Sequence, residues 1–316
     1  MQFRTKIPIP HNTSQIDYNA KIVSLGSCFA VNIADKFDYF KFENSCNPFG
    51  ILFHPFAIEK LIDFAVSGKE FTEKDVFFYN ERWHCFDAHS DLSNANKDEI
   101  IANLNAIVTA TKLQLQAASH IIITYGTSWV YRNIATDLIV ANCHKVPQKQ
   151  FIKEILSVET ITKSMQNTLD LIQKINPNVN FIFTVSPVRH LKDGFAENQL
   201  SKAHIISAIH KTINDKPKTI NYFPSYEIMM DELRDYRFYA EDMIHPSSVA
   251  IDYIWQRFSE TCISEESQSI MKEVETIQKG LAHRPFNSNS ESHQQFLSKL
   301  RDKMVKLQKQ FPQIQF

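Results

Sequence analysis

The sequence predicts a three-layer α/β/α domain built around a parallel sheet of five strands. Short apolar runs of strand length alternate along the chain with longer stretches whose apolar residues recur at helical spacing. This alternation is typical of strand-helix-strand units, in which helices cover both faces of a parallel sheet. The chain has only 6 glycines, and Gly26, Gly50 and Gly126 stand at or soon after the ends of strand-like runs. Glycine at such positions indicates sharp turns between elements.

Five runs are predicted to form the sheet, because each contains β-branched or aromatic residues and is followed by a polar or turn-forming residue. They cover residues 21–25, 38–43, 120–125, 180–185 and 219–223. Helices are predicted where apolar residues repeat every three or four positions. These stretches cover residues 28–37, 56–67, 97–117, 150–175, 197–213 and 248–281.

Residues 1–286 are predicted to form one domain, and residues 287–316 a helical extension. The extension carries a single apolar stripe among Lys, Arg and Gln residues, and such a stripe needs a partner surface. Two partners fit: its own domain, or a second copy of the chain, which would make a homo-oligomer. Residues 71–91 interrupt the alternation with a cluster of aromatic side chains and are predicted to form an insertion or hairpin beside the site.

Composition indicates a globular protein, since 43% of the residues are hydrophobic. The 34 basic and 35 acidic residues nearly cancel, so charge favours neither a nucleic-acid nor a membrane partner. Nowhere do about 18 apolar residues run together, and the amino terminus does not resemble a signal peptide, so we expect a cytoplasmic location. The 5 cysteines are scattered without a Cys-x-x-Cys pattern, and no histidine spacing suggests a metal site. We therefore expect no metal and no cofactor.

Two segments far apart in the chain carry the chemistry. Residues 26–30 read Gly-Ser-Cys-Phe-Ala and follow the first strand directly, which places the Ser27 hydroxyl at the amino end of a helix. Free amides and the helix dipole favour a developing oxyanion there. Far downstream, His245 can act as a general base if folding brings it to Ser27, and Asp242 can orient its imidazole. The two segments together predict a Ser27, Asp242 and His245 triad.

Two other interpretations of the first segment compete with this one. Ser27 can simply cap the helix that follows, a role that serine often takes. Cys28 can be the nucleophile, because a thiol at a helix amino terminus often has a lowered pKa and Cys-His pairs are also catalytic. We expect instead that the Cys28 side chain points away from Ser27, into the contact between helix and sheet.

Several further segments accompany these two. They are Asn-Pro-Phe-Gly at 47–50, Thr-Tyr-Gly-Thr at 124–127, and residues 141–147, 185–190 and 242–247. Taken together, residues 21–247 resemble the GSCFA family, which is named for the sequence at 26–30 and is similar to the SGNH or GDSL-like esterases and lipases. The resemblance implies a flavodoxin-like, SGNH hydrolase-like fold with strand order 2-1-3-4-5. It also implies that the nucleophile lies in the first segment and that the Asp and His lie in the last.

The resemblance also implies an oxyanion site made of the Ser27 amide, a glycine amide, which Gly50 matches, and an asparagine side chain after the third strand. The residues at that place are Tyr-Gly-Thr-Ser-Trp, without asparagine, so Thr127, beside Gly126, is expected to replace it through its hydroxyl or amide. Four polar residues at the edges of apolar runs are expected to line the crevice and bind the substrate, although structural histidines are an alternative for two of them. They are Asn142, His144, Arg189 and His190.

The sequence therefore predicts a serine-dependent esterase that acts on an acyl or acetyl ester of a small molecule or carbohydrate. Two alternatives fit the same residues: an O-acyltransferase with the same triad, and a non-catalytic carbohydrate-binding or scaffold protein on the same fold. The position of His245 relative to Ser27 distinguishes the enzymes from the binding protein, because residues so far apart in sequence meet only if the fold brings them together.

Overall fold

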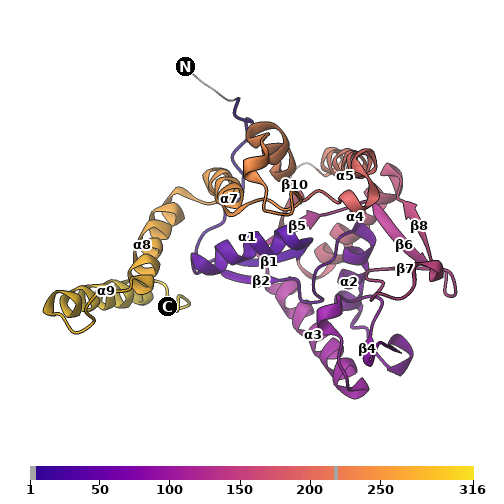
Figure 1. Ribbon diagram of the computed structural model, residues 1–316, viewed down its shortest axis with the longest axis horizontal. Helices are drawn as coiled ribbons and strands as arrows, with labels where there is room; N and C mark the ends of the chain where they lie inside the picture. The colour runs from indigo at the N-terminus through magenta and orange to yellow at the C-terminus, as the bar shows by residue number, and fades with distance from the viewer. Residues whose placement is uncertain (1–4, 217–219) are drawn as a thin grey trace.

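A five-stranded parallel sheet forms the centre of the computed structural model, which describes residues 5–216 and 220–316 (Figure 1). Its strands are β1 (Lys21–Gly26), β2 (Glu43–Cys46), β5 (His120–Tyr125), β9 (Asn180–Val185) and β10 (Ile220–Phe223). All neighbouring strands pair in parallel, in the order β2-β1-β5-β9-β10. The predicted strand order 2-1-3-4-5 is therefore confirmed. In this order the chain leaves β1 and β5 in opposite directions along the sheet, and ligands usually bind at that point.

Helices cover both faces of the sheet. One face carries α1 (Cys28–Tyr39) and α7 (Ser248–Cys262), and the other carries α2 (Pro55–Ser67), α3 (Lys97–Ala117), α4 (Val158–Ile175) and α5 (Phe195–Asp215). Alternate residues of each strand divide between the two cores: Ile22 packs with α1, whereas Val23 packs with α2 and α3. Strands buried on both faces explain why the sequence shows continuous apolar runs.

The second strand lies later in the chain than predicted. Residues 38–43 were expected to form it, but α1 continues to Tyr39 and the strand begins at Glu43. Lys41 has a φ of 65° in the turn, and Phe42 is buried against Tyr18, with ring centroids 4.3 Å apart. The aromatic residues of this run therefore pack in the core between the helices. The polar segment that follows pairs with β1, a pairing that local propensity does not reveal.

Two predicted helices are interrupted. The first part of the helix expected over 150–175 is instead strand β8 (Phe151–Ile155), and the helix, α4, begins only at Val158, where Ser157 caps it by accepting the Thr160 amide. The helix expected over 248–281 is two helices, α7 and α8 (Glu265–Ala282), because Ser264 caps the second by accepting the Ser267 amide. Of the last predicted strand, Thr219 lies outside the described residues.

Smaller elements lie outside the central sheet and its covering helices. The predicted insertion at 71–91 contains a hairpin of β3 (Phe77–Tyr79) and β4 (Arg82–His84), and a second sheet that was not predicted joins β6 (Trp129–Asn133), β7 (Leu138–Val140) and β8 in antiparallel pairs. The remaining elements are 3-10 helices at Glu73–Asp75, Ser90–Leu92, Gln148–Gln150, Leu191–Asp193 and Tyr236–Phe238, the short helix α6 (Ser225–Glu227) and a π-helix at Ile228–Leu233.

The carboxyl-terminal extension docks on its own chain. Helix α9 (Glu291–Gln310) packs against α8, with Leu300 over Gly280, and the two project from one edge of the sheet (Figure 1). The segment after α9 returns to the body, where the ring of Phe311 lies 5.4 Å from that of Tyr18. The chain's own domain was one of the two partners expected for the apolar stripe of this extension. Among the described residues, no helix is both long and apolar enough to cross a membrane.

Replacing Gly26 with alanine should destabilise the fold strongly. Gly26 has a φ of 127°, and a Cβ there would lie 2.1 Å from the Thr124 carbonyl oxygen. We expect Gly26→Ala to lower the free energy of unfolding by about 2 to 4 kcal/mol, from backbone strain and overpacking together.

Gly68→Ala is the matched control in the same urea titration. Gly68 has a φ of 72°, but a Cβ there meets nothing within 4 Å, so only the strain of about 1 kcal/mol remains. Equal losses in the two variants would contradict the steric argument.

Candidate active site

The Ser27 hydroxyl is buried and has no hydrogen-bond partner. Ser27 lies between β1 and α1, with none of its surface exposed, and its Oγ contacts no donor or acceptor within hydrogen-bond distance in the part of the chain described. Although Ser27 occupies the capping position of α1, its side chain caps no amide. The capping interpretation therefore does not account for this serine, and an unpaired buried hydroxyl calls for another explanation.

The loops after β1 and β5 and the segment before α2 meet at this serine. A Cβ built on Gly126 would lie 3.2 Å from the Ser27 Cβ and 3.4 Å from the ring of Phe53. The Phe53 carbonyl accepts the amides of Gly126 and Thr127, at 2.8 and 3.0 Å. Three segments far apart in sequence thus enclose the hydroxyl at the carboxyl edge of the sheet.

Asp242 and His245 form a tight pair. His245 Nδ1 lies 2.6 Å from Asp242 Oδ2, while Asp242 Oδ1 accepts the amides of Ile244 and His245 at 2.9 and 3.0 Å. These hydrogen bonds, led by the His245 amide, lower the pKa of Asp242 to about 2, so the carboxylate is ionised at neutral pH. An ionised carboxylate accepts the proton on Nδ1, which leaves Nε2 of a neutral imidazole free to accept one.

The loop that carries this pair is anchored to the segment after β9. The Arg189 amide donates to Ile244 O at 3.2 Å, its guanidinium donates to Met243 O, and its Cζ lies 4.1 Å from the centre of the Tyr239 ring. Arg189, expected to bind substrate, is thus committed to holding the loop of His245. No hydrogen bond joins His245 to Ser27 in this structure, since Ser27 Oγ has no partner.

His190 is the predicted substrate-binding residue that lies nearest to this chemistry. Its ring packs edge-on against Phe53, with centroids 5.8 Å apart, and its Nε2 is buried without a partner. Burial, followed by the charges of Lys202 and His245, lowers the pKa of His190 to about 3. The imidazole is therefore neutral at neutral pH, and it lies between Phe53 and the loop of His245.

The donors expected to form the oxyanion site already have partners. The amides of Ser27 and Gly50 donate to Thr124 O and Asn47 O, at 3.0 and 2.7 Å, while those of Gly126 and Thr127 donate to Phe53 O. The Thr127 hydroxyl lies 3.0 Å from Ser201 Oγ and accepts the Trp129 amide. In this conformation none of these amides is free, so their assignment to the oxyanion stays a prediction that requires them to be released.

Asn142 and His144 belong to a separate polar network. His144 Nε2 donates to Cys85 O at 2.7 Å, so the neutral ring accepts at Nδ1 from Ser90 Oγ, 3.0 Å away. Asn142 Oδ1 accepts the His144 amide at 2.8 Å. Burial lowers the pKa of His144 to about 4, which keeps the ring neutral. Both ring nitrogens of His144 are occupied, as in the alternative of a structural histidine, and His144 borders a cavity of about 500 Å³.

Family models match nearly the whole chain. The model described as the GSCFA family matches residues 21–258, and the model of the GSCFA domain protein, C-terminal domain, matches residues 274–316. The chain belongs to the GSCFA family. No curated protein is similar enough to count as a match. The second model begins within α8, so α9 lies inside it together with the segment that returns to Tyr18.

The GSCFA domain also holds a buried lysine that the sequence analysis missed. Lys202 on α5 is 1% exposed, and its ammonium donates to Gly126 O and Ser186 O, both at 2.7 Å. These carbonyls directly follow β5 and β9, so one side chain ties two strand ends together beside Ser27. Burial lowers the pKa of Lys202 to about 7, with a small opposing effect from Cys28. In the sequence, Lys202 looks like an ordinary surface lysine of an amphipathic helix, so no sequence signal indicates that it is buried.

Cys28 is poorly suited to replace Ser27 as nucleophile. Its thiol is partly buried, and burial raises its pKa above the ordinary value despite the nearby Lys202 ammonium. A thiol attacks as thiolate, so this environment disfavours reaction at neutral pH.

Within residues 5–216 and 220–316, no group of three or more His, Cys, Asp or Glu side chains is arranged to hold a metal ion.

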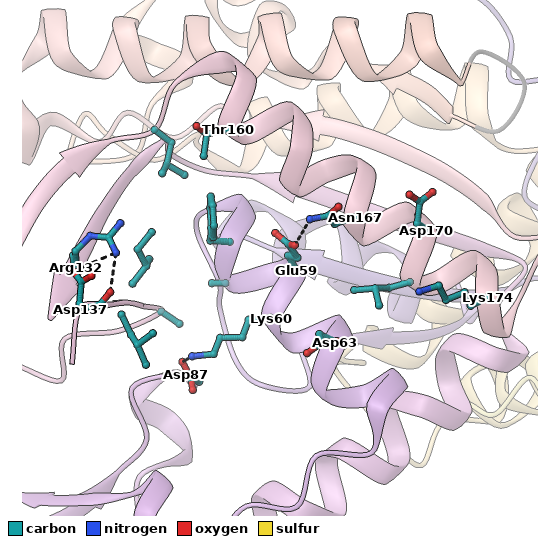
Figure 2. A pocket seen from close by; sticks show the side chains of 17 residues that line it. Glu59, Lys60, Asp63, Asp87, Arg132, Asp137, Thr160, Asn167, Asp170 and Lys174 are labelled. Carbon is teal, nitrogen blue, oxygen red and sulfur yellow. Dashed lines mark hydrogen bonds and ion pairs between the residues drawn. The ribbon is translucent and has the colours of Figure 1, made fainter.

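A large cavity lies elsewhere in the GSCFA domain, between α2, α4 and the β6-β7 hairpin (Figure 2). It measures about 680 Å³, and none of the predicted site residues lines it. Several of its polar groups pair with one another, such as Lys60 with Asp87 at 2.6 Å and Glu59 with the Asn167 amide at 2.7 Å. This cavity therefore lies apart from the predicted site residues and from the unpaired Ser27 hydroxyl.

Removing the Arg189 guanidinium should loosen the loop of His245. The Ala240 and Met243 amides donate within this loop, to His245 O and Ala240 O. In Arg189→Met we expect their hydrogen exchange to accelerate about tenfold, the effect of losing one charge-assisted hydrogen bond. Arg237→Met is the control, because Arg237 is exposed and bonds only locally. Equal protection in both variants would mean that Arg189 does not restrain the loop.

Lys202 should make stability depend on pH. Its pKa is about 7 in the folded protein and 10.5 ordinarily, so between these values the unfolded chain binds more protons and stability rises with pH. The slope approaches about 1.4 kcal/mol per pH unit. Urea titrations from about pH 7.5 to about pH 9.5 should show this rise in the wild type and in Lys211→Met, an exposed control on the same helix. The Lys202→Met variant should lack this rise. If stability rose equally with pH in Lys202→Met and in the wild type, Lys202 would not be the group responsible.

Proposed function

We propose that this GSCFA protein is a serine-dependent ester hydrolase on an SGNH-like, flavodoxin-like fold. Ser27 is the nucleophile, His245 the general base, and Asp242 the carboxylate that orients the imidazole. The observation that carries the proposal is the Ser27 hydroxyl, buried without a partner at the carboxyl edge of a parallel sheet. Leaving a buried hydroxyl unpaired costs about 1 to 3 kcal/mol, a cost that a catalytic role explains.

Catalysis requires a local movement. Ser27 has no exposed surface, whereas the side chain of His245 is 48% exposed and that of Asp242 is 46% exposed. Substrate binding must therefore open the surroundings of Ser27 and bring His245 Nε2 within hydrogen-bond reach of its hydroxyl. Catalytic hydrogen bonds that form only in the substrate complex are common among enzymes.

The chemistry then follows from the proton positions. His245 Nε2 takes the Ser27 proton as Oγ attacks the acyl carbonyl, and Asp242 stabilises the imidazolium through Nδ1. His245 returns the proton to the leaving alcohol when the ester bond breaks. Water, deprotonated by His245, attacks the acyl-enzyme, and His245 returns that proton to Ser27 Oγ as the bond to the acyl group breaks and the acid leaves. We propose a short acyl group, such as acetyl, on a small molecule or carbohydrate, and no nucleic acid or membrane partner; self-association through α9 is proposed as the oligomeric contact.

Purified protein should cleave p-nitrophenyl acetate. Ser27→Ala and His245→Ala should each lower kcat by about a thousandfold or more, and the double variant should be little worse, because triad members act as a unit. Asp242→Asn should also lose most activity, since the amide does not fix the same tautomer.

Cys28→Ala is the matched control for Ser27→Ala, since the two residues are adjacent and the thiol is the rival nucleophile. It should keep nearly full activity. Turnover that depends on Cys28 and survives Ser27→Ala would replace the serine mechanism with a thiol one, and a wild type without esterase activity on any short acyl ester would refute the proposed function.

A further inference from the structure

Asn47 follows β2 as Ser27 follows β1, and hydrogen bonds fix it from three sides. Its amide donates to Ser24 O at 2.9 Å, and its carbonyl accepts the Gly50 amide at 2.7 Å. Its side-chain Oδ1 accepts the Gly26 amide at 2.7 Å, and its φ is 44°, a left-handed conformation that asparagine tolerates. The residue is therefore held rigidly against the one that precedes the nucleophile.

The other end of this side chain has no partner. Asn47 Nδ2 is buried and donates no hydrogen bond to any described residue. The orientation of the amide is settled by chemistry, because the Gly26 N–H can only be satisfied by the oxygen. Two N–H bonds of Nδ2 thus lie unused in the interior, on a side chain bonded to the residue before Ser27, whose hydroxyl is also buried and unused.

We propose that Asn47 Nδ2 is the side-chain donor to the oxyanion in the reaction of Ser27. This inference rests on the proposed ester hydrolysis and supplies the asparagine that is missing after β5, where the chain reads Tyr-Gly-Thr. The amides of the four residues expected to form the oxyanion site already donate to carbonyls, whereas Nδ2 needs to break no bond to receive a charge. A donor that is fixed before the reaction stabilises developing charge most effectively.

His190 Nε2, a second unpaired group among the loops at this edge, fits the role less well. The charges that act on His190 are those of Lys202 and His245, so it lies on the side of the general base. Asn47 lies on the β2 side of β1, away from the loop of His245. When Oγ attacks, the carbonyl π electrons move to oxygen, and Nδ2 donates a hydrogen bond without transferring a proton.

Asn47→Asp tests the donor with almost no change in shape. The carboxylate keeps an acceptor for the Gly26 amide but cannot donate. We expect kcat on p-nitrophenyl acetate to fall by about a hundredfold to a thousandfold with KM within about threefold of the wild type. A boronic acid, which forms a tetrahedral adduct with Ser27, should lose affinity in proportion to kcat, a readout that a structural role would not move.

Asn47→Gly is the second variant, because glycine suits the positive φ and removes the amide without adding charge; it should show the same fall in kcat. Asn44→Asp is the matched control on β2, since Asn44 Oδ1 likewise accepts a hydrogen bond from β1, from the Ser24 hydroxyl at 2.9 Å. The control should keep kcat within about threefold of the wild type.

The outcomes separate the two proposals. If Ser27→Ala is inactive while both Asn47 variants turn over like the wild type, or lose only KM, the inference is wrong and the esterase function stands. If the wild type cleaves no ester, the function fails first and the inference fails with it. Parallel losses of kcat and boronic acid affinity in both Asn47 variants, with normal Asn44→Asp, establish the donor.

Discussion

The close approach of Gly26 to the backbone of Thr124 is the contact on which the site depends. With a φ of 127° and no side chain, Gly26 lets β1 end against β5 and turn directly into α1. The Gly26 amide donates to Asn47 Oδ1, and the Gly26 carbonyl accepts the Leu52 amide. The amide of the next residue, Ser27, donates to Thr124 O. The chain after β1 therefore has a single path, and Ser27 is placed by the backbone rather than by its own side chain.

Several unpaired polar atoms lie in the loops at the carboxyl edge of the sheet, where Ser27 is placed. Ser27 Oγ, Asn47 Nδ2 and His190 Nε2 belong to the loops after three different strands of one sheet, and all three are buried without partners. Arg189 Nε and the Tyr125 hydroxyl, after β9 and at the end of β5, are also unpaired, whereas others, such as those of Thr111, Gln114 and Ser164, lie on helices. By contrast, the buried Arg257 and Glu232 pair with each other away from this edge. Stability alone would favour partners for all of them, so the gathering at one edge points to reaction chemistry.

Local patterns predicted the elements best where propensity and tertiary structure agree. The strands at 120–125 and 180–185 and the helix at 97–117 have the predicted bounds, because their apolar spacing is unambiguous. β2 was misplaced, since its polar residues pair with β1 while the aromatic run before it fills the core. The sheet of β6, β7 and β8 was missed, because its strands are short and their pairing is not local.

The sequence by itself determined the strand order implied by the family resemblance and the contact of Asp242 with His245, which depends on three residues of spacing. Only the tertiary structure showed that Lys202 ties the ends of β5 and β9 together, that Arg189 anchors the loop of His245, and that Asn47 keeps an unpaired amide. The reason is physical. A hydrogen bond between neighbours in sequence follows from local geometry, whereas the partner of a buried polar group is decided by which distant segments the packed core brings to the same edge.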